Sequence, residues 1–258
     1  MADAPSLSRG RSVPDDVTVC VTSCGRADLL GRTLDSFRHH NGPGRLLISE
    51  DSGDAEMIAW LRRTYPDATI LSGPERLGMM GSVDRLYAAV ETPFIFHLED
   101  DWETGAPVDF AAAKRVLESR PQVSVVCMRA FSELKPRHRA SARGFTEAGC
   151  EFRLMQPDVH PEWYGYTANP GLLRKAFWEP FRPISRWTHD GFSAHVKAEG
   201  FEVAFMLPGV ARHIGGGRHV VDPFQPRTSD KSRLSRMRKK AKTWLAERIR
   251  AVTGKLRG

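Results

Sequence analysis

Hydrophobic and polar positions along the first part of the chain follow the pattern of short strands separated by helices. Apolar and β-branched residues predict strands at residues 17–22, 45–49, 68–71 and 94–98. Apolar residues at helical spacing predict helices from about residue 28, at 55–63 and at 79–90. Asp28 is expected to cap the first helix. Because the connections are short, this order predicts a mostly parallel α/β sheet with helices on both faces.

The second half has a less regular pattern. Helices are predicted at residues 108–119, 172–178 and 190–199, the last ending at Gly200, and strands at 123–128 and 201–207. The polar and basic stretch 133–149 predicts a loop. Residues 103–228 are therefore assigned to the second half of one domain, whose first half is residues 15–102.

One apolar strand ends in a run of acids. The segment from Phe94 to Leu98 is followed directly by Glu99, Asp100 and Asp101. Three negative charges at the end of a buried strand are costly unless something compensates them. A hard divalent cation bound through oxygen ligands would do so. The alternative is a solvated acidic turn.

Three polar segments are expected to meet at one edge of the sheet. In parallel sheets of this kind, ligands bind beyond the carboxyl ends of the strands. The turn after the first strand, Glu50 and Asp51 after the second, and the acidic run after the fourth all open onto that edge. The glycines form neither a GxGxxG motif nor a P-loop, which disfavours dinucleotide binding and ordinary NTPase chemistry.

Composition is that of a soluble globular protein. The 258 residues are 41% hydrophobic and 27% charged, and no apolar run approaches the ~20 residues that span a membrane. The first residues lack the pattern of a signal peptide, so a cytoplasmic location is expected. Four cysteines make neither a disulfide framework nor zinc-ligand spacing, so they are expected to be reduced thiols.

The positive charge is concentrated in a C-terminal tail, residues 229–258. From Lys231 onward there are eleven Lys and Arg against Glu247 alone, about +10, which leaves about −3 of the net +7 for the rest. Apolar residues including Trp244 recur there at helical spacing, which favours a basic amphipathic helix on an anionic membrane surface. Docking onto a partner is the main alternative, and nucleic acid is disfavoured. Residues 1–14 are expected to be disordered.

Several segments, in their order and spacing, are similar to motifs of one enzyme family. The first strand and turn are similar to an apolar strand followed by Pro-Thr-Tyr-Asn-Arg and two leucines, with Thr22, Cys24 and Gly25 at the Pro, Tyr and Asn positions. The other matching segments are Ile48–Asp54, Arg76–Asp84 (with both end residues at Asn positions), Glu99–Asp101 at a DxD motif, Thr188–Asp190 and His213. On these motifs, residues 17–219 resemble the GT-A glycosyltransferases, close to the large family-2 type.

The resemblance implies a nucleoside-diphosphate sugar donor and a divalent metal, Mn²⁺ or Mg²⁺. The metal would stabilise the charge that develops on the leaving diphosphate. By the resemblance Asp101 is the direct ligand, Glu99 binds directly or through water, and His213 is a third ligand whose imidazole favours Mn²⁺. For His213, a surface histidine at the start of a loop is the alternative.

Other residues are assigned to the donor. Carboxylates at the edge are expected to accept hydrogen bonds from the ribose or base, and arginines to face phosphates; a solvated turn and surface charges are the alternatives. Gly215–His219 is expected to be a lid, or else a plain flexible loop. The predicted donor-binding residues are Thr22, Ser23, Arg26, Glu50, Asp51, Arg76, Asp84, Asp100 and Arg218.

An inverting transfer needs a general base for the acceptor hydroxyl. Asp190, near the start of a helix, is predicted to be that base, with helix capping as the alternative role and His189 or His195 as alternative bases. Aromatic faces can hold the apolar face of a sugar ring, although such residues also pack in cores. The predicted acceptor-binding residues are Trp163, Tyr164, Trp187 and His189, and Tyr166 is a further aromatic candidate.

The sequence thus predicts a metal-dependent, inverting glycosyltransferase that acts on a glycan or lipid-linked acceptor, peripheral to a membrane. A sugar nucleotidyltransferase and a non-catalytic GT-A-like binding protein are the alternatives. The turn from Ser23 to Arg26 is too short for the Gly-rich basic loop of a nucleotidyltransferase.

Overall fold

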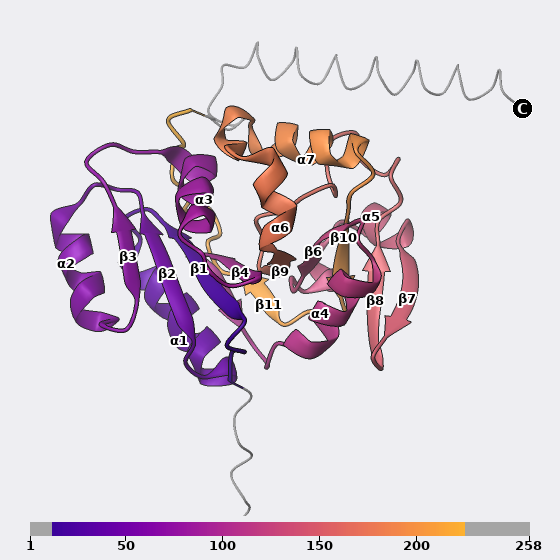
Figure 1. Ribbon diagram of the computed structural model, residues 1–258, viewed down its shortest axis with the longest axis horizontal. Coiled ribbons are helices and arrows are strands. Elements are labelled where there is room, and N and C mark those ends of the chain that lie inside the picture. The colour runs from indigo at the N-terminus through magenta and orange to yellow at the C-terminus, as the bar shows by residue number, and fades with distance from the viewer. Residues whose placement is uncertain (1–11, 225–258) are drawn as a thin grey trace, which may run out of the picture. The chain divides into compact units, whose positions relative to one another are not determined.

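A computed structural model describes residues 12–224 (Figure 1). The chain divides into two units after His219, and of the second unit only residues 220–224 are described. The predicted amphipathic tail and most of the predicted disordered N-terminus lie outside the described residues. Among the described helices, none has the length and apolar character needed to cross a membrane.

The first half of the sheet has the predicted order of elements. Its strands are β1 (Val17–Ser23), β2 (Arg45–Glu50), β3 (Thr69–Ser72) and β4 (Phe94–Glu99). Its helices are α1 (Ala27–Asn41), α2 (Ala55–Thr64) and α3 (Gly78–Ala88). The strands are parallel and lie in the order β3-β2-β1-β4. The prediction of a cap at Asp28 is wrong: α1 starts at Ala27 without a side-chain cap, and Asp28 lies in its first turn.

The second half adds strands in both directions. Its strands are β5 (Trp102–Thr104), β6 (Val123–Cys127), β7 (Arg143–Glu147), β8 (Cys150–Leu154), β9 (Gly171–Arg174), β10 (Glu202–Met206) and β11 (Ala211–His213). Its helices are α4 (Phe110–Ser119), α5 (Pro136–Ala140), α6 (Lys175–Trp178) and α7 (His189–Ala198), with 3₁₀ turns at Phe131–Glu133, Glu179–Phe181 and Ile184–Arg186. α7 ends before Gly200, as predicted, and this glycine has a φ of 89°.

Two predictions for this half are wrong. The stretch 172–178 is not one helix, because β9 takes its first part and only α6 is helical. Gly171 permits this: a Cβ there would lie 2.6 Å from Val125 Cγ1 and 2.9 Å from the Val126 carbonyl oxygen. Only glycine therefore lets β9 pair this closely with β6. The stretch 133–149 is not a plain loop, since it contains α5 and β7.

The central sheet is mostly parallel. Its nine strands lie in the order β3-β2-β1-β4-β9-β6-β10-β8-β7. β9 is antiparallel to both β4 and β6, β10 is parallel to β6, and β8 is antiparallel to β10 and β7. Within this sheet only β9 and β8 thus oppose the common direction. β5 and β11 form a separate two-stranded ladder.

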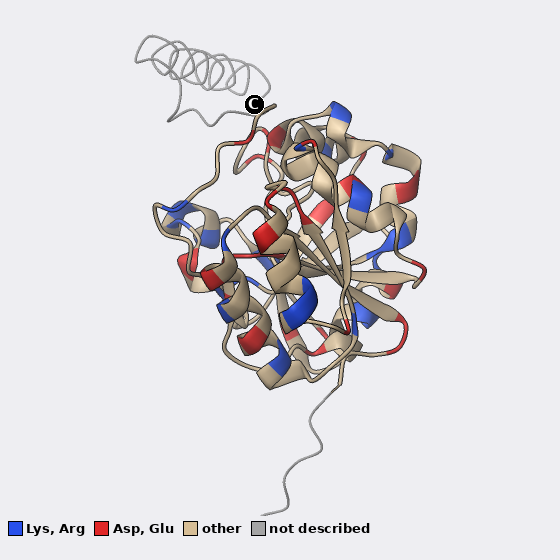
Figure 2. Ribbon diagram, turned by 90° about the vertical axis from the view of Figure 1, so that its left-hand side faces the viewer, with Lys and Arg blue, Asp and Glu red and all other residues tan. Residues whose placement is uncertain are grey.

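Helices cover both faces of the sheet, as the sequence predicts. Alternate residues of β4 point to opposite faces. Phe96 packs against Phe37 of α1 and Phe110 of α4, whereas Ile95 belongs to the core under α3, α6 and α7. Charged residues lie mainly on the helices and loops, and the central strands are mostly uncharged (Figure 2). Burying a large apolar side chain such as Phe96 or Ile95 contributes about 1.5–3 kcal/mol. The two apolar faces therefore stabilise the sheet that carries the site.

Candidate functional site

Strand register brings the three predicted polar ends to one level of the sheet edge. Ser23 of β1 pairs with Glu50 of β2, and Thr22 pairs with Glu99 of β4. The backbone N–H of Asp51 donates to the Ser23 carbonyl at 2.9 Å, and that of Asp100 donates to the Thr22 carbonyl at 3.1 Å. The ladder therefore continues one residue past each strand and holds both acidic turns against the end of β1.

The acids at the end of β2 accept hydrogen bonds from backbone groups of the protein itself. Glu50 is fully buried, and its Oε1 accepts from the backbone N–H groups of Gly25 and Ser52, both at 2.9 Å. Asp51 accepts from the N–H groups of Leu77 and Gly78 at 2.8 and 2.9 Å, at the start of α3. Both carboxylates hold backbone turns and so shape the edge, while the buried Glu50 Oε2 has no hydrogen-bond partner among the described residues. Their contact with a donor stays a prediction.

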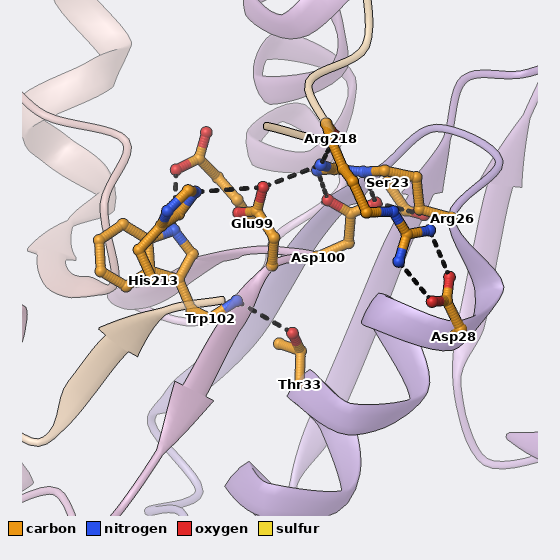
Figure 3. A network of polar contacts seen from close by, with 10 residues as sticks. Ser23, Arg26, Asp28, Thr33, Glu99, Asp100, Trp102, His213 and Arg218 are labelled. Atoms are coloured by element: carbon orange, nitrogen blue, oxygen red, sulfur yellow. Dashed lines mark hydrogen bonds and ion pairs between the residues drawn. The ribbon is translucent and has the colours of Figure 1, made fainter. Parts of the chain in front are cut away.

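Arg26 links the acids that follow β4 (Figure 3). Its Nε donates to Asp100 Oδ2 at 3.2 Å, its Nη2 donates to Asp100 Oδ1, and its Nη1 lies 2.9 Å from Asp101 Oδ2. Burial works to lower the pKa of Arg26, but the two carboxylates outweigh it and raise that pKa. Burial raises the pKa of Asp100, while the Arg26 guanidinium opposes that rise. Ser23 Oγ also donates to Asp100 Oδ2, at 3.3 Å.

The β5–β11 ladder brings His213 to Asp101. His213 pairs in register with Trp102, and their rings lie 5.2 Å apart. His213 Nε2 is 3.4 Å from Asp101 Oδ2, and the Ile214 N–H donates to the Asp101 carbonyl at 2.8 Å. A Cβ on Gly215 would lie 2.3 Å from Asp101 Oδ2, so a side chain there would force the carboxylate or the chain to move. The chain after β11 therefore packs directly onto this carboxylate.

The third predicted ligand, Glu99, is engaged elsewhere. Its Oε2 accepts from Trp102 Nε1 at 3.1 Å. Burial, with help from the Asp101 charge, raises the pKa of Glu99 to about 7, against the effect of the Trp102 hydrogen bond. In the part of the chain that the structure describes, no group of three or more His, Cys, Asp or Glu residues could hold a metal. Of the three predicted ligands, Asp101 and His213 lie together and Glu99 bonds to Trp102, so the role of each as a metal ligand stays a prediction.

Hydrogen bonds of two arginines hold the predicted lid, residues 215–219, against α1 and the acidic cluster (Figure 3). Arg218 Nη1 and Nη2 donate to the Asp28 carboxylate at 2.6 and 2.9 Å. The Arg218 hydrogen bond, helped by the nearby positive charge, lowers the pKa of Asp28 to about 2, although desolvation opposes it. Arg26 Nη1 donates to the Arg218 carbonyl at 2.7 Å. The Arg218 side chain thus contacts α1, and its backbone contacts the arginine of the acidic cluster.

Two other predicted donor residues have different surroundings. Asp84 of α3 accepts from Trp178 Nε1 at 2.9 Å and from the backbone N–H groups of Ile184 and Ser185 at 3.0 and 2.8 Å. It therefore joins α3 to the second half of the chain. Arg76 lies near enough to Cys24 for its charge to act on the pKa of that thiol, but burial of the thiol dominates and raises this pKa.

Asp190 lies beside an aromatic ring at the start of α7. The helix cap is Thr188, whose Oγ1 accepts from the Gly191 N–H at 2.9 Å, so Asp190 is not the cap. Asp190 Oδ1 accepts from Trp163 Nε1 at 3.1 Å and lies 3.5 Å from His189 Nδ1. His189 acts electrostatically on Glu99, lowering its pKa, and thus lies near the acidic cluster. Gly165 makes the contact with α7 possible, because a Cβ there would be 2.1 Å from the Ser193 carbonyl oxygen.

A cavity of about 300 Å³ adjoins Asp190 through Trp163. Two of the predicted acceptor residues, Trp163 and Tyr164, line it, as does Tyr166. Trp187 does not line the cavity. Its ring stacks on that of His195 in α7, with 4.9 Å between the ring centroids. The sequence prediction did not include the basic part of the lining, Arg129, Lys135 and His138. The basic character of residues 133–149 was the available signal.

Comparisons with known proteins place the fold. No protein-family model matches the sequence, and a search of curated proteins finds no match. Among solved structures, GalNAc-T7 with UDP, GalNAc and Mn²⁺ aligns with a TM-score of 0.52 and 12% identity, over 76% of this chain and 43% of that one. The mannosyltransferase PcManGT from Pyrobaculum calidifontis, in complex with GDP-Man and Mn²⁺, aligns with a TM-score of 0.52 and 16% identity, over 74% and 56%. The chain has a GT-A fold.

The GT-A fold places the cluster in context. The chain spans about half the length of these neighbours, 43% and 56%. In this GT-A chain the strand β4 ends at the acids, and Arg26, Asp100, Asp101 and His213 gather at that end. The fold predicted from the sequence motifs is therefore confirmed.

Proposed function

We propose that the chain is a metal-dependent glycosyltransferase that transfers a sugar from a nucleoside-diphosphate sugar to a glycan or lipid-linked acceptor. The observation that carries the proposal is the pair of Asp101 and His213 at the carboxyl edge of a GT-A sheet, 3.4 Å apart and beside Arg26. The two solved neighbours, which carry UDP or GDP-Man with Mn²⁺, support it.

The donor atoms of this pair fit a divalent cation. Neighbouring ligands on a cation with bonds of about 2.1 Å are separated by roughly 3 Å, close to the present distance. A carboxylate and an imidazole together favour Mn²⁺ over Mg²⁺. Asp101 and His213 would hold the metal, and it would stabilise the negative charge of the leaving diphosphate. With two protein ligands, the other positions fall to donor oxygens and water.

The chain's own residues supply charge and proton transfer. Asp100 and Asp101 hold the positive charge of Arg26 at the edge of the sheet. A bound diphosphate can take over part of the pairing that Arg26 makes with these carboxylates. We assign donor contacts to Ser23, Arg26 and Asp100, with Thr22 supporting the strand end. In an inverting transfer, Asp190 takes the proton of the acceptor hydroxyl. Trp163 orients the Asp190 carboxylate through the hydrogen bond from Nε1.

The membrane part of the proposal rests on the sequence. A peripheral contact with anionic lipid through residues 229–258 follows from their basic, amphipathic pattern. Co-sedimentation with anionic liposomes, compared with a chain ending at Asp230, tests it. Equal binding by both chains would contradict this assignment.

The decisive experiment pairs one ligand variant with a neighbouring acid. UDP- and GDP-sugars are assayed for transfer and hydrolysis with Mn²⁺ and with EDTA. Asp101→Asn is expected to reduce turnover by at least about 100-fold because it weakens the charge that binds the metal. Glu103→Gln is the control, since Glu103 is an exposed residue of β5 paired with Arg32 at 3.3 Å. Its turnover should stay within about twofold of the parent protein.

Two outcomes would overturn the proposal. Turnover that persists in EDTA and in Asp101→Asn would exclude the metal mechanism. If no nucleotide sugar binds to the parent protein at all, the non-catalytic GT-A-like binding protein is the better description.

A further inference from the structure

The cavity beside Trp163 has an unusual combination of walls. Trp163 provides an aromatic surface, with His160 stacked on it at 3.9 Å and 13° between planes. Lys135 Nζ lies 5.9 Å from the centroid of the same ring. Arg129 forms another part of the wall and lies over Trp102, 5.4 Å from that ring centroid. The cavity therefore runs from the proposed base towards the Trp102 side of the acidic cluster.

The charge of the lining is positive. Arg129 is paired with Glu133, whose Oε2 is 3.4 Å from Arg129 Nε. Among the described residues, no carboxylate lies within ion-pair distance of Lys135. Burial first, then the charges of Arg137 and Lys135, lowers the pKa of His138. The lining therefore carries one more positive than negative charge, located at Lys135.

Tyr164 adds a hydrogen-bond donor. Arg137 Nε donates to His138 Nε2 at 3.1 Å, so this nitrogen carries no proton in the neutral ring. The imidazole proton is then on Nδ1, which donates to Tyr164 Oη at 2.6 Å. Burial raises the pKa of Tyr164 to about 12, so the phenol keeps its own proton and can donate it to another group. Tyr164 also has a φ of 76°, a rare conformation for a non-glycine residue that recurs at functional sites.

We propose that this cavity binds an acceptor sugar that bears an anionic group, either a carboxylate or a phosphate. The sugar ring would lie on Trp163, and the anion would contact Lys135 and the Tyr164 hydroxyl. This inference rests on the proposed glycosyltransferase function, because Trp163 also holds the proposed base Asp190. An acceptor in this cavity thus has its ring beside the group that takes its proton.

The experiment measures binding of three simple sugars to the full chain by ligand-observed NMR, without metal. Glucuronic acid, glucose 1-phosphate and glucose are compared. At least one anionic sugar should bind about tenfold more tightly than glucose, and the tighter of the two identifies the anion. Lys135→Gln should remove about tenfold of that affinity. The matched control is Arg139→Gln in α5, the helix that Lys135 precedes; Arg139 is exposed, does not line the cavity, and its substitution should leave affinity unchanged.

The results separate this inference from the proposed function. Equal binding of the three sugars, or an unchanged affinity in Lys135→Gln, would overturn the anionic-acceptor assignment even if nucleotide sugars bind and turn over. Selective binding of an anionic sugar that is lost in Lys135→Gln and kept in Arg139→Gln supports it. If that result occurs in a protein with no nucleotide-sugar turnover, the cavity is an anionic-sugar site and the transferase function is wrong.

Discussion

The sheet edge and the aromatic cavity satisfy their polar groups in different ways. At the edge, Glu50 and Asp51 are taken up by backbone N–H groups, and Asp100 by Arg26. At the cavity, Trp163 contacts the ring of His160, and the cation of Lys135 has no carboxylate partner among the described residues. The edge is a network built to hold charge in place. The cavity leaves charge and aromatic surface available.

This difference indicates where binding specificity resides. Glu50 and Asp51 each accept two backbone hydrogen bonds, so the loss of either carboxylate would disturb the turn it holds. The half-buried indole of Trp163 and the exposed ammonium of Lys135 can gain ligand contacts by giving up water rather than a carboxylate partner. We therefore expect substitutions at the edge to affect metal binding and stability, and substitutions at the cavity to affect the choice of acceptor.

The largest expected effect concerns the residue that joins the two regions. Asp190→Asn should reduce kcat by about 10²- to 10⁴-fold, because the amide keeps the Trp163 hydrogen bond but cannot accept the proton. Initial rates of sugar transfer measure it, and donor binding should be unchanged. A parent-like kcat would move the role of base to another group, with His189 the first candidate.

A smaller effect is expected where the chain packs onto the metal ligand. Gly215→Ala places a Cβ 2.3 Å from Asp101 Oδ2, so the carboxylate or the chain must move. Mn²⁺ affinity, measured by EPR, should fall by about tenfold to a hundredfold.

The adjacent glycine provides the control for this packing. A Cβ on Gly216 meets nothing within 4 Å, so Gly216→Ala should bind Mn²⁺ like the parent. Equal affinities in the two variants would show that the contact with Asp101 does not shape the metal site.

The smallest effect concerns stability in acid. His97 of β4 is fully buried near Tyr87, and burial, followed by the charge of His189, lowers its pKa from 6.5 to about 3. The unfolded chain binds the proton more readily, so this stability is complete above pH 6.5 and is lost as pH falls towards 3. From pH 7 to pH 5 the loss should be about 2 kcal/mol.

Urea unfolding at the two pH values measures this loss. His97→Leu should flatten the pH dependence by that amount, whatever its absolute stability, because it removes the buried group that protonates on unfolding. His39→Gln, at an exposed position of α1, is the control and should keep the parent slope. A parent-like slope in His97→Leu would exclude His97 as its source. The pH dependence of stability would then not distinguish the core beneath the sheet edge from the cavity.

Local pattern predicted most of the first half of the fold. The continuous apolar residues of β1 and β4 identify strands buried on both faces, and the helical spacing between them leaves few other arrangements. β9 was missed because its four residues carry no alternation, and its place depends on Gly171 meeting β6 far away in the chain. A contact of that kind has no local signal.

The site was predictable in position and less so in detail. The order of motifs singled out Asp101 and His213, which the structure brings within 3.4 Å of each other, and strand register explains why the first acids meet. The sequence did not indicate that Arg26 would pair with Asp100 and Asp101, or that Glu99 would bond to Trp102. Those partners depend on side-chain direction at strand ends, where residues no longer alternate regularly. The basic wall of the cavity depends on α5. The sequence of this segment has the pattern of a loop, so the helix was not predicted.

The ladder between β5 and β11 also joins parts of the site that are synthesised at very different times. Asp100, Asp101 and Arg26 are made early, whereas His213 and Gly215 come near the end of the described chain. Arg26, which pairs with both acids, is thus present in the growing chain long before His213. The pair that we propose as metal ligands is complete only when β11 has been made and has joined β5.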